Sequence, residues 1–301
     1  MKYLITGVNG QLGHDLFKIL NDGKNSLLAP SSKEMNLLDE KQIHEVIEGF
    51  KPDVIIHAAA YTAVDNADKS IEEADKCFLV NKVGTDAIVN AARKVNAKVI
   101  YVSTDYVFDG EKSEPYKVDD EVNPVNWYGK TKQLGEESVL AYEKGMVVRT
   151  QWVFGINGKN FVKTMLKLAN TIDELNVVCD QLGAPTYTVD LAKKLVLLSE
   201  SFDRGIYHAS NTGDMSWYDF AKMIFEMNGI DIPVKGVKTF EYKTKTMAAR
   251  PLNTTLDKSK LINDVGIMED ASDALERYMS ELKNDEEMKL VLKENSKRWK
   301  R

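Results

Sequence analysis

The chain has 301 residues, 43% of them hydrophobic, and a formal net charge of −6 at pH 7. This length and composition allow a large buried core and exclude a disordered or fibrous protein. The negative charge argues against nucleic acid or an anionic membrane as a partner, because both are bound through clustered Lys and Arg. The two cysteines, Cys77 and Cys179, are too few for a disulfide framework. We expect buried thiols and a reducing, cytoplasmic setting, with neither a signal peptide nor a membrane span.

The first residues predict a nucleotide-binding turn. An apolar segment at residues 3–5 leads into three evenly spaced glycines, Gly7, Gly10 and Gly13, after which a helical pattern begins. A buried strand that turns through glycines into a helix presents backbone N–H groups and the positive end of the helix dipole to a pyrophosphate. The spacing G-x-x-G-x-x-G is similar to that of extended short-chain dehydrogenases/reductases.

Short apolar strands alternate with amphipathic helices in the first half of the chain. This alternation predicts an α/β fold with a Rossmann-type, doubly wound parallel sheet and helices on both faces. Gly145 is placed to end the last helix as its C-cap. We expect strands at residues 3–5, 27–29, 54–57, 98–102 and 146–149, and helices at 11–21, 40–49, 71–79, 83–95 and 127–143.

The pattern is less regular after residue 150, where we expect helices at 160–170, 188–200, 216–228 and 270–293. We assign residues 1–150 to the nucleotide-binding domain, completed by short returns of the chain near 175–183 and 205–210. We assign residues 151–301 mainly to a smaller, mixed α/β substrate lobe that covers the cofactor edge.

Candidate catalytic side chains follow the fourth strand. Ser103 and Thr104 lie at its carboxyl end, where open parallel sheets bind their ligands. Tyr128 and Lys132 share one face of the next helix, and a nearby ammonium lowers the pKa of a phenol. Tyr128 is therefore a candidate proton donor or acceptor. The alternative for Thr104 is a hydroxyl that only caps the strand end.

A second pair with the same spacing, Tyr218 and Lys222, lies in the second half of the chain. About one such pair is expected by chance at this composition. Because only Tyr128 follows a strand end that carries hydroxyl groups, we predict that Tyr128 and Lys132 are catalytic. Tyr218 is expected to pack or to form hydrogen bonds locally.

Four segments resemble the dTDP-4-dehydrorhamnose reductase family: His57–Asp65, Ser103–Gly110, Tyr128–Glu136 and Asp180–Thr186. The resemblance extends from Met1 to about Asp257. It implies NADPH-dependent reduction of the C4 keto group of dTDP-4-dehydro-L-rhamnose, in nucleotide-sugar and cell-surface polysaccharide synthesis. Tyr128 would protonate the developing alkoxide, and Lys132 would bind the nicotinamide ribose.

The same resemblance implies the binding residues. Thr104 and Asp105 would contact the sugar, and Trp152 and Arg250 would hold the sugar nucleotide. Trp152 could instead be a core aromatic, and Arg250 a surface charge. The cofactor would be held by Gly7, Gly10, Gln11, Leu12, Gly13, Ser31, Ser32, Lys33, Asn36, Leu37, Ala58, Ala59, Ala60, Tyr61, Thr62, Ser103, Tyr128 and Lys132.

The end of the second strand bears on cofactor choice. Residues 30–33 contain no Asp or Glu for a ribose 2′-hydroxyl, whereas Ser31, Ser32 and Lys33 could accept a 2′-phosphate. We therefore expect NADPH to be preferred and NADH tolerated. At the adenine edge Asn36 stands where the family often has Asp, so an amide replaces a charge.

Some family members dimerise through magnesium held by glutamates. Asp15 and Asp190 stand at two of those positions, and Glu281 at the third. Because shorter acids reach less far and isolated surface carboxylates are usually solvated, we expect a monomer or weak homodimer and no required metal.

Two other classes of function stay open. One is a related nucleotide-sugar epimerase, dehydratase or reductase, which shares the Tyr and Lys. The other is a non-catalytic regulatory subunit, similar to that of methionine adenosyltransferase. Thr104, Tyr128 and Lys132 favour an enzyme.

Overall fold

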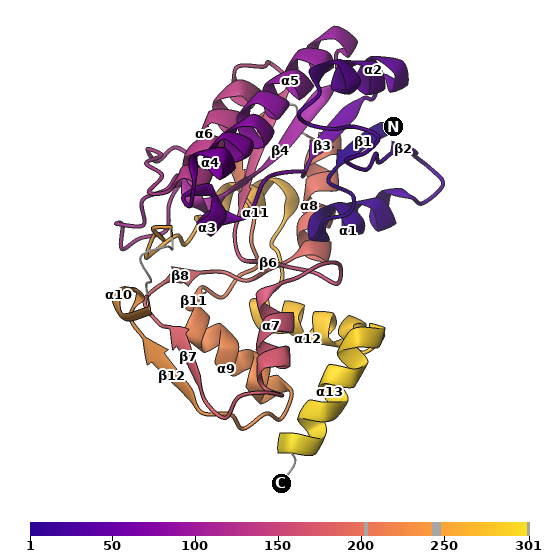
Figure 1. The fold of residues 1–301 in the computed structure, drawn as a ribbon. Coiled ribbons are helices and arrows are strands. Elements are labelled where there is room, and N and C mark those ends of the chain that lie inside the picture. Colours follow the sequence, from indigo (N-terminus) through magenta and orange to yellow (C-terminus); the bar gives the residue numbers. More distant parts are fainter. Residues whose placement is uncertain (202–203, 243–247, 300–301) are drawn as a thin grey trace.

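The computed structural model describes residues 1–201, 204–242 and 248–299, which form two lobes, one above the other in Figure 1. The upper lobe is built on a six-stranded sheet in which all neighbouring strands are parallel. The predicted α/β class with a Rossmann-type sheet is confirmed. The strands lie in the order β10 (Gly205–His208), β5 (Gly145–Thr150), β4 (Lys98–Thr104), β3 (Val54–His57), β1 (Lys2–Thr6) and β2 (Ser26–Leu28).

Helices cover both faces of this sheet because side chains alternate along its strands. In β1, Tyr3 and Ile5 pack into one buried cluster, whereas Leu4 packs into the cluster on the opposite face. The first face carries α1 (Gln11–Leu20), α8 (Thr188–Ser201) and α11 (Ser259–Val265). The second face carries α2 (Glu40–Phe50), α5 (Gly84–Val95) and α6 (Trp127–Leu140).

The helices predicted at 71–79 and 83–95 form one continuous rod. Short helix α3 (Val64–Ala67) precedes α4 (Ile71–Phe78), which passes through a π-helical turn (Leu79–Val83) directly into α5. The backbone at both junctions stays right-handed helical, so no residue interrupts the rod.

The prediction that Gly145 caps a helix is wrong. Helix α6 ends at Leu140 with Ala141 as C-cap, and Gly145 begins β5. A Cβ at Gly145 would lie 1.8 Å from the Val139 carbonyl oxygen, so glycine is needed here for the close approach of strand and helix.

The lower lobe packs around its own apolar core, which includes Phe154, Leu166, Phe220, Leu275 and Met288. The two-residue strand pairs β6 (Val153–Phe154) with β9 (Thr186–Tyr187) and β8 (Leu182–Gly183) with β11 (Met215–Ser216) lie above it. Its remaining elements are α7 (Phe161–Leu168), β7 (Leu175–Val178), α9 (Trp217–Met227), β12 (Val234–Val237), α10 (Thr239–Tyr242), α12 (Ala271–Leu282) and α13 (Glu286–Trp299).

Two expectations for this half differ from the structure. Residues 175–178 do not return to the large sheet: β7 pairs in parallel with β12 within the lower lobe. The single helix expected at 270–293 is two helices, because the Asp285 carboxylate accepts the Met288 N–H at 3.0 Å and starts a new helix.

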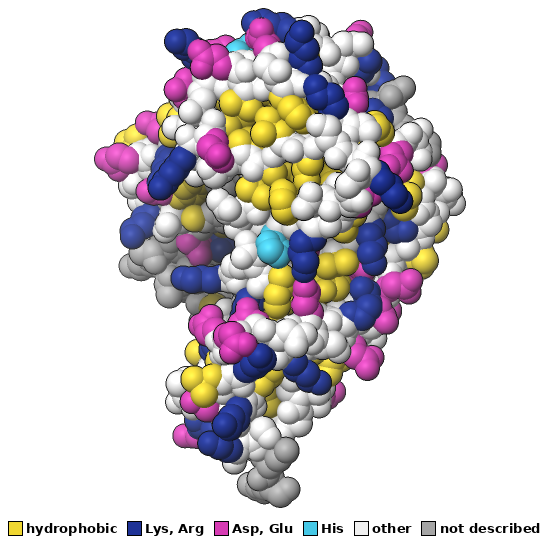
Figure 2. Space-filling view, turned by 90° about the vertical axis from the view of Figure 1, so that its right-hand side faces the viewer, with side chains coloured by type: hydrophobic (Ala, Val, Ile, Leu, Met, Phe, Trp, Pro, Cys, Tyr) yellow, Lys and Arg dark blue, Asp and Glu magenta, His cyan; other side chains and the backbone are white. Residues whose placement is uncertain are grey.

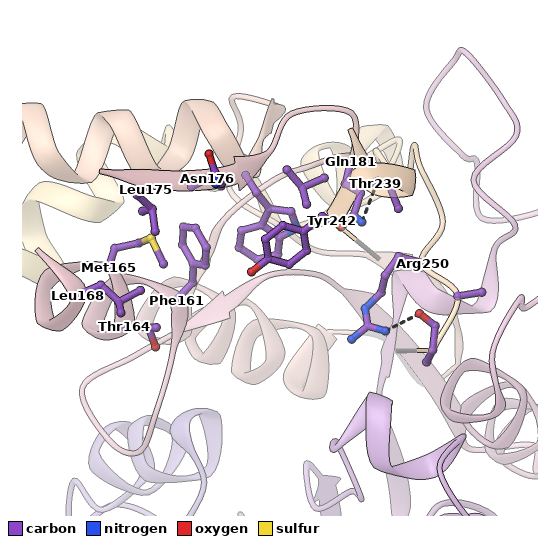
Figure 3. Close-up of a pocket in the computed structure, with 15 residues that line it drawn as sticks. Phe161, Thr164, Met165, Leu168, Leu175, Asn176, Gln181, Thr239, Tyr242 and Arg250 are labelled. Atoms are coloured by element: carbon purple, nitrogen blue, oxygen red, sulfur yellow. Dashed lines mark hydrogen bonds between the residues drawn. The ribbon is translucent and has the colours of Figure 1, made fainter. Parts of the chain in front are cut away.

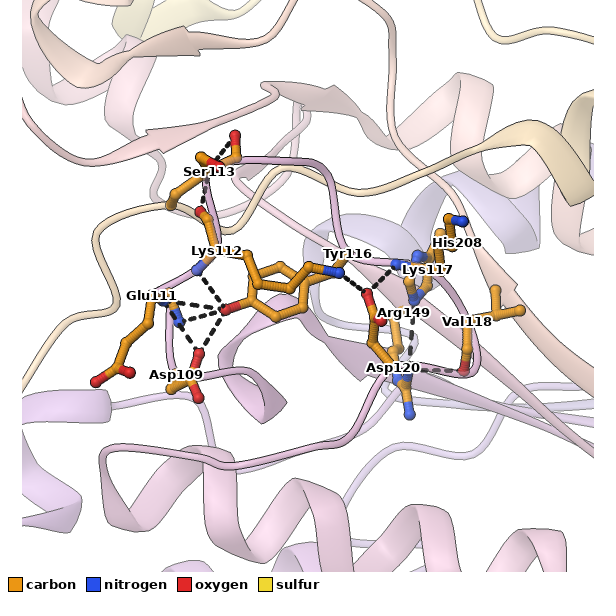
Figure 4. A network of polar contacts seen from close by, with 12 residues as sticks. Asp109, Glu111, Lys112, Ser113, Tyr116, Lys117, Val118, Asp120, Arg149 and His208 are labelled. Carbon is orange, nitrogen blue, oxygen red and sulfur yellow. Dashed lines mark hydrogen bonds and ion pairs between the residues drawn. The ribbon is translucent and has the colours of Figure 1, made fainter.

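The loop between β4 and α6 is held by a polar network (Figure 4). The Tyr116 hydroxyl donates to Asp109 Oδ1 at 2.5 Å and accepts the N–H groups of Gly110, Glu111 and Lys112. Such a hub gives several loop amides a partner at once. The network therefore fixes the path of the loop that leads from β4 to the start of α6.

Basic and acidic side chains intermingle over the face shown in Figure 2, with apolar patches between them. Cys77 is buried as expected, whereas Cys179 is only partly buried. Among the described residues, no helix has the length and apolar character needed to cross a membrane.

Candidate functional site

A cavity of about 630 Å³ opens at the carboxyl ends of β1, β3, β4 and β5. Carboxyl strand ends of a doubly wound sheet are where such folds bind ligands. The structure brings many of the predicted site residues together in its wall: Gly7, Gly10, Gln11, Leu12, Gly13, Ala58, Ala59, Ala60, Thr62, Ser103, Thr104, Asp105, Tyr128, Lys132 and Trp152.

The glycine turn has the close approaches that a nucleotide cradle needs. Gly7 has φ +75°, and a Cβ there would lie 2.8 Å from the Ala59 amide nitrogen. A Cβ at Gly13 would lie 2.1 Å from the Gly7 carbonyl oxygen. Gly10 caps α1 without a side chain, which leaves the first amides of the helix for a ligand. These features fit a dinucleotide pyrophosphate.

The Gln11 side chain joins the two lobes. Its Oε1 accepts the Gly155 N–H at 2.9 Å and the Asn160 amide at 3.1 Å. Asn157 adds a bond from its amide to the Asn9 carbonyl oxygen at 2.8 Å. The loop that follows β6 therefore borders the glycine turn, and it brings Lys159 to the cavity wall.

Tyr128 lies at the start of α6, directly beside Thr104. Asn126 caps the helix by accepting the Gly129 N–H at 2.8 Å. Gly129 lets the helix approach the turn after β4, because a Cβ there would lie 2.1 Å from the Tyr106 carbonyl oxygen. The Thr104 hydroxyl lies close enough to the Tyr128 phenol to influence its pKa, and both side chains line the cavity. The predicted pair of hydroxyl groups therefore shares the cavity.

Lys132 is 1% exposed, and its ammonium donates to the Val102 carbonyl oxygen at 2.8 Å. It also lies 3.8 Å from the centre of the Tyr101 ring, a cation–π contact. Burial lowers the pKa of Lys132 from 10.5 to about 7. The ammonium is thus turned toward β4 in this structure.

The expected lowering of the Tyr128 pKa is wrong for this state of the protein. Burial raises the pKa of the phenol well above 10.0, and the neighbouring Thr104 hydroxyl opposes this rise only in part. The neighbouring Asp105 carboxylate raises the pKa further by its negative charge. Tyr128 therefore rests in its protonated form, as a proton donor must.

Trp152 follows β5 with a left-handed backbone, φ 47°. Its ring stacks on Trp217 with centroids 3.6 Å apart and planes at 10°. A Cβ at Gly183 would lie 2.7 Å from the Trp152 ring, so Gly183 also packs closely against it. Strained backbone of this kind persists only where the surroundings impose it. Trp152 is therefore an aromatic of the cavity wall rather than of a lobe core.

Seven predicted residues lie outside this cavity wall: Ser31, Ser32, Lys33, Asn36, Leu37, Tyr61 and Arg250. Both the N–H and the hydroxyl of Ser31 donate to Glu34 at 2.8 Å. An acid, Glu34, therefore follows directly after residues 30–33 and binds Ser31. Asn36 accepts the Leu38 N–H at 3.0 Å, and the Tyr61 hydroxyl donates to Glu73.

Arg250 faces a second, mainly apolar cavity of about 420 Å³ in the lower lobe (Figure 3). Its guanidinium pairs with Asp65 at 2.8 Å and donates to the Ala248 carbonyl oxygen at 2.8 Å. Trp217 lines both cavities, so the two adjoin at its ring.

Sequence reasoning missed several residues of the site. Trp217, Gln151, Gly158 and Lys159 line the catalytic cavity although none of them belongs to a recognised motif. The only sequence signal for Trp217 is its place after Ser216, which caps α9 in a capping box with Asp219.

Asp15 and Asp190 are buried and Glu281 is only partly exposed, so the acids at the magnesium positions are not freely solvated, which corrects the sequence-based expectation. Asp15 accepts the Thr188 hydroxyl at 2.5 Å, and Asp190 forms a bidentate pair with Arg277 at 2.7 and 2.8 Å. Glu281 accepts the Tyr187 hydroxyl at 2.8 Å. Within the described ranges, no three metal-ligating side chains are grouped to hold an ion.

Comparison with known proteins gives consistent results. Residues 1–284 match the family described as the RmlD substrate binding domain. The spore coat polysaccharide biosynthesis protein SpsK of Bacillus subtilis is 40% identical, with 93% of this chain and 97% of the relative covered. A dTDP-4-dehydrorhamnose reductase of Aggregatibacter actinomycetemcomitans is 41% identical, with 88% and 94% covered.

A solved structure supports the same assignment. The dTDP-4-dehydrorhamnose reductase of Bacillus anthracis in complex with NADP has a TM-score of 0.88 against this chain, with 38% identity and 93% and 99% of the two chains covered. The chain therefore belongs to the dTDP-4-dehydrorhamnose reductase family.

Proposed function

We propose that the protein reduces the C4 keto group of dTDP-4-dehydro-L-rhamnose to give dTDP-L-rhamnose. The observation that carries this proposal is one cavity that holds both a dinucleotide-type glycine turn and Thr104, Tyr128 and Lys132. Membership of the reductase family supplies the substrate class.

The bound nicotinamide cofactor supplies the hydride for this reduction. Tyr128 rests protonated and donates its proton to the oxygen of the former keto group. The Thr104 hydroxyl, which donates to Asp105 before the substrate binds, turns its proton to this oxygen and stabilises the negative charge that develops there. Lys132, which donates to the Val102 carbonyl oxygen in this structure, would hold the ribose hydroxyls of the cofactor, and its charge would favour the tyrosinate left after proton transfer.

The sugar nucleotide would extend from one cavity into the other. Trp152 and Trp217 offer stacked rings beside the cavity that holds Tyr128, and Asp105 can accept a sugar hydroxyl. The apolar cavity beyond Trp217 suits a nucleobase. Arg250 at its wall would exchange Asp65 for the diphosphate.

For the cofactor, NADPH is preferred and NADH tolerated. Ser32 and Lys33 are exposed at the end of β2 and can meet a 2′-phosphate. The Glu34 carboxylate, which binds Ser31, opposes this charge. Glu34→Gln should therefore raise the ratio of kcat/KM for NADPH over NADH about three- to tenfold. A ratio that stays constant would contradict this role of Glu34.

The protein is a monomer or weak homodimer, and magnesium is not required. Arg277 already neutralises Asp190, and the Thr188 hydroxyl donates to one oxygen of Asp15. Activity should be unchanged by a chelator, and light scattering should give the same mass with and without magnesium. A magnesium-dependent dimer would overturn this part of the proposal.

The deciding experiment follows NADPH absorbance with dTDP-4-dehydro-L-rhamnose as substrate and identifies the product. Stoichiometric oxidation with formation of dTDP-L-rhamnose is expected. Conversion of the sugar without net oxidation would indicate an epimerase or dehydratase instead. Cofactor binding without any turnover of sugar nucleotides would indicate a regulatory subunit.

A further inference from the structure

A buried line of hydrogen bonds runs from the C-terminal part of the chain to Thr104, the neighbour of the proton donor. Thr254 is 2% exposed, and its hydroxyl donates to Asp105 Oδ2 at 2.5 Å. The other oxygen, Oδ1, accepts the Thr104 hydroxyl at 3.0 Å. Thr104 in turn lies beside Tyr128 and influences its pKa. The motif that contains Asp105 thus depends on a residue 149 positions away.

The backbone around Thr254 is held by both halves of the molecule. The Thr254 N–H donates to the Leu182 carbonyl oxygen at 2.9 Å, and the Asn253 N–H donates to the Gly110 carbonyl oxygen at 3.2 Å. Leu182 belongs to β8 of the lower lobe, and Gly110 to the loop after β4. The position of the Thr254 hydroxyl therefore depends on how the two lobes pack against each other.

The direction of these bonds matters for catalysis. An ionised carboxylate only accepts hydrogen bonds, so both threonine hydroxyls point their protons at Asp105. The bond to Asp105 therefore holds the Thr104 side chain in one orientation beside the Tyr128 phenol. If Asp105 turned away, Thr104 would be free to rotate and this alignment would be lost.

We propose that Thr254 is a positioning residue for the reduction: it holds the Asp105 carboxylate, and through it Thr104 and Tyr128, in the arrangement that delivers the proton. This inference rests on the proposed reductase function. Thr254 itself contacts neither the glycine turn nor the second cavity.

The pH dependence of the reaction gives a specific readout. Burial raises the pKa of Asp105 to about 6, and the bonds from Thr254 and Thr104 oppose this rise. The phenols Tyr106 on its own turn and Tyr128 on α6 interact with its charge, and Arg250 acts on Tyr106 from the segment of Thr254. Removal of the Thr254 hydroxyl removes a bond to the charged form, so the pKa of Asp105 should rise.

The test compares three variants of the full chain. Thr254→Val removes the hydroxyl at nearly constant volume, and Thr254→Ser keeps it. Thr255→Val is the matched control, because the Thr255 hydroxyl donates to Asn253 at 2.9 Å and not to Asp105. The readouts are kcat, KM for sugar nucleotide, NADPH affinity by fluorescence, the pH profile of kcat/KM, and Tm.

For Thr254→Val, we expect kcat to fall about tenfold and the acid limb of the pH profile to move up by about one pH unit. NADPH affinity should stay within about twofold of that of the parent protein. Thr254→Ser should restore both kcat and the pH profile, and Thr255→Val should change neither. Should Thr254→Val fail to fold, Thr254→Ala takes its place as the variant without a hydroxyl and is compared with Thr254→Ser in the same assays.

The inference is overturned if Thr254→Val keeps the parent kcat and pH profile, or if Thr254→Ser is as impaired as Thr254→Val. It is also overturned if Thr255→Val moves the acid limb equally. An inactive parent protein would instead refute the proposed reductase function and this inference with it. If the parent protein is active and Thr254→Val is unaffected, only the inference about Thr254 is refuted and the proposed reductase function stands.

Discussion

Helices α6 and α9 each carry a Tyr and a Lys four residues apart, yet the two pairs lie in opposite surroundings. Tyr128 and Lys132 of α6 are buried, and both line the catalytic cavity. On α9, Lys222 is exposed and lies over the ring of Tyr218, 5.6 Å from its centre. Lys132 instead lies over Tyr101 of β4. The spacing is equal in both pairs, but Lys132 is buried and Lys222 is exposed to solvent.

This difference shows that the i, i+4 spacing alone does not create a catalytic pair. Helix α6 packs on the carboxyl end of β4, where Thr104 and the Val102 carbonyl oxygen are available. Helix α9 packs in the lower lobe core through Phe220 and Ile224. Its contribution to the site is Trp217, at its first position.

The largest expected effect is on the reaction itself. Tyr128→Phe removes the proton donor, so kcat should fall about 10³-fold, whereas Tyr218→Phe should stay within about twofold of the parent. Both are measured as substrate-dependent NADPH oxidation. If Tyr218→Phe lowered kcat as much as Tyr128→Phe does, the proposed difference in catalytic role between α6 and α9 would be wrong.

The second largest effect is expected for the two lysines, whose replacement should change the kinetics to different extents. Lys132→Met removes the charge that supports ribose binding and the tyrosinate, so kcat/KM should fall about 10²-fold, and Lys222→Met should have no effect beyond about twofold. Steady-state kinetics at several NADPH concentrations would separate binding from turnover. Near-parent kinetics of Lys132→Met would contradict its proposed role.

Helix α9 should matter for binding rather than for proton transfer. Trp217→Ala removes the ring stacked on Trp152, so KM for the sugar nucleotide should rise about tenfold with kcat within about threefold. Tyr218→Ala on the same helix is the matched control. A selective loss of kcat in Trp217→Ala would mean that the ring orients the reacting groups.

The smallest effect concerns stability and pH. Because the pKa of Lys132 is lowered from 10.5 to about 7, the unfolded chain binds a proton between these values that the folded chain has released. The free energy of unfolding therefore rises with pH across this window. Lys132→Met should raise Tm by about 3 °C near neutral pH, and this gain should shrink toward about pH 10.

The matched variant Lys222→Met should show no such trend, since this side chain is exposed in the folded protein. Thermal unfolding at several pH values tests both variants. A constant Tm difference for Lys132→Met across the window would show that burial of the ammonium does not govern its effect.

Local sequence determined the parts of the molecule whose geometry depends on neighbours in the chain. The glycine turn, the strand ends at Ala58–Ala60 and Ser103–Asp105, and the start of α6 were all predicted, and they meet in one cavity. Strand alternation and turn chemistry are short-range properties, so they can be read along the chain.

The tertiary structure alone decided which distant residues meet and how strongly each is buried. Thr254 reaches Asp105, and Trp217 stacks on Trp152, through packing between segments that no short motif links. The direction of the Tyr128 pKa also depended on burial, which outweighed the charge expected from spacing. Desolvation and long-range contacts arise from the packing of the lobes. The spacing of residues along one helix cannot predict them, because it carries no information about which segments cover that helix.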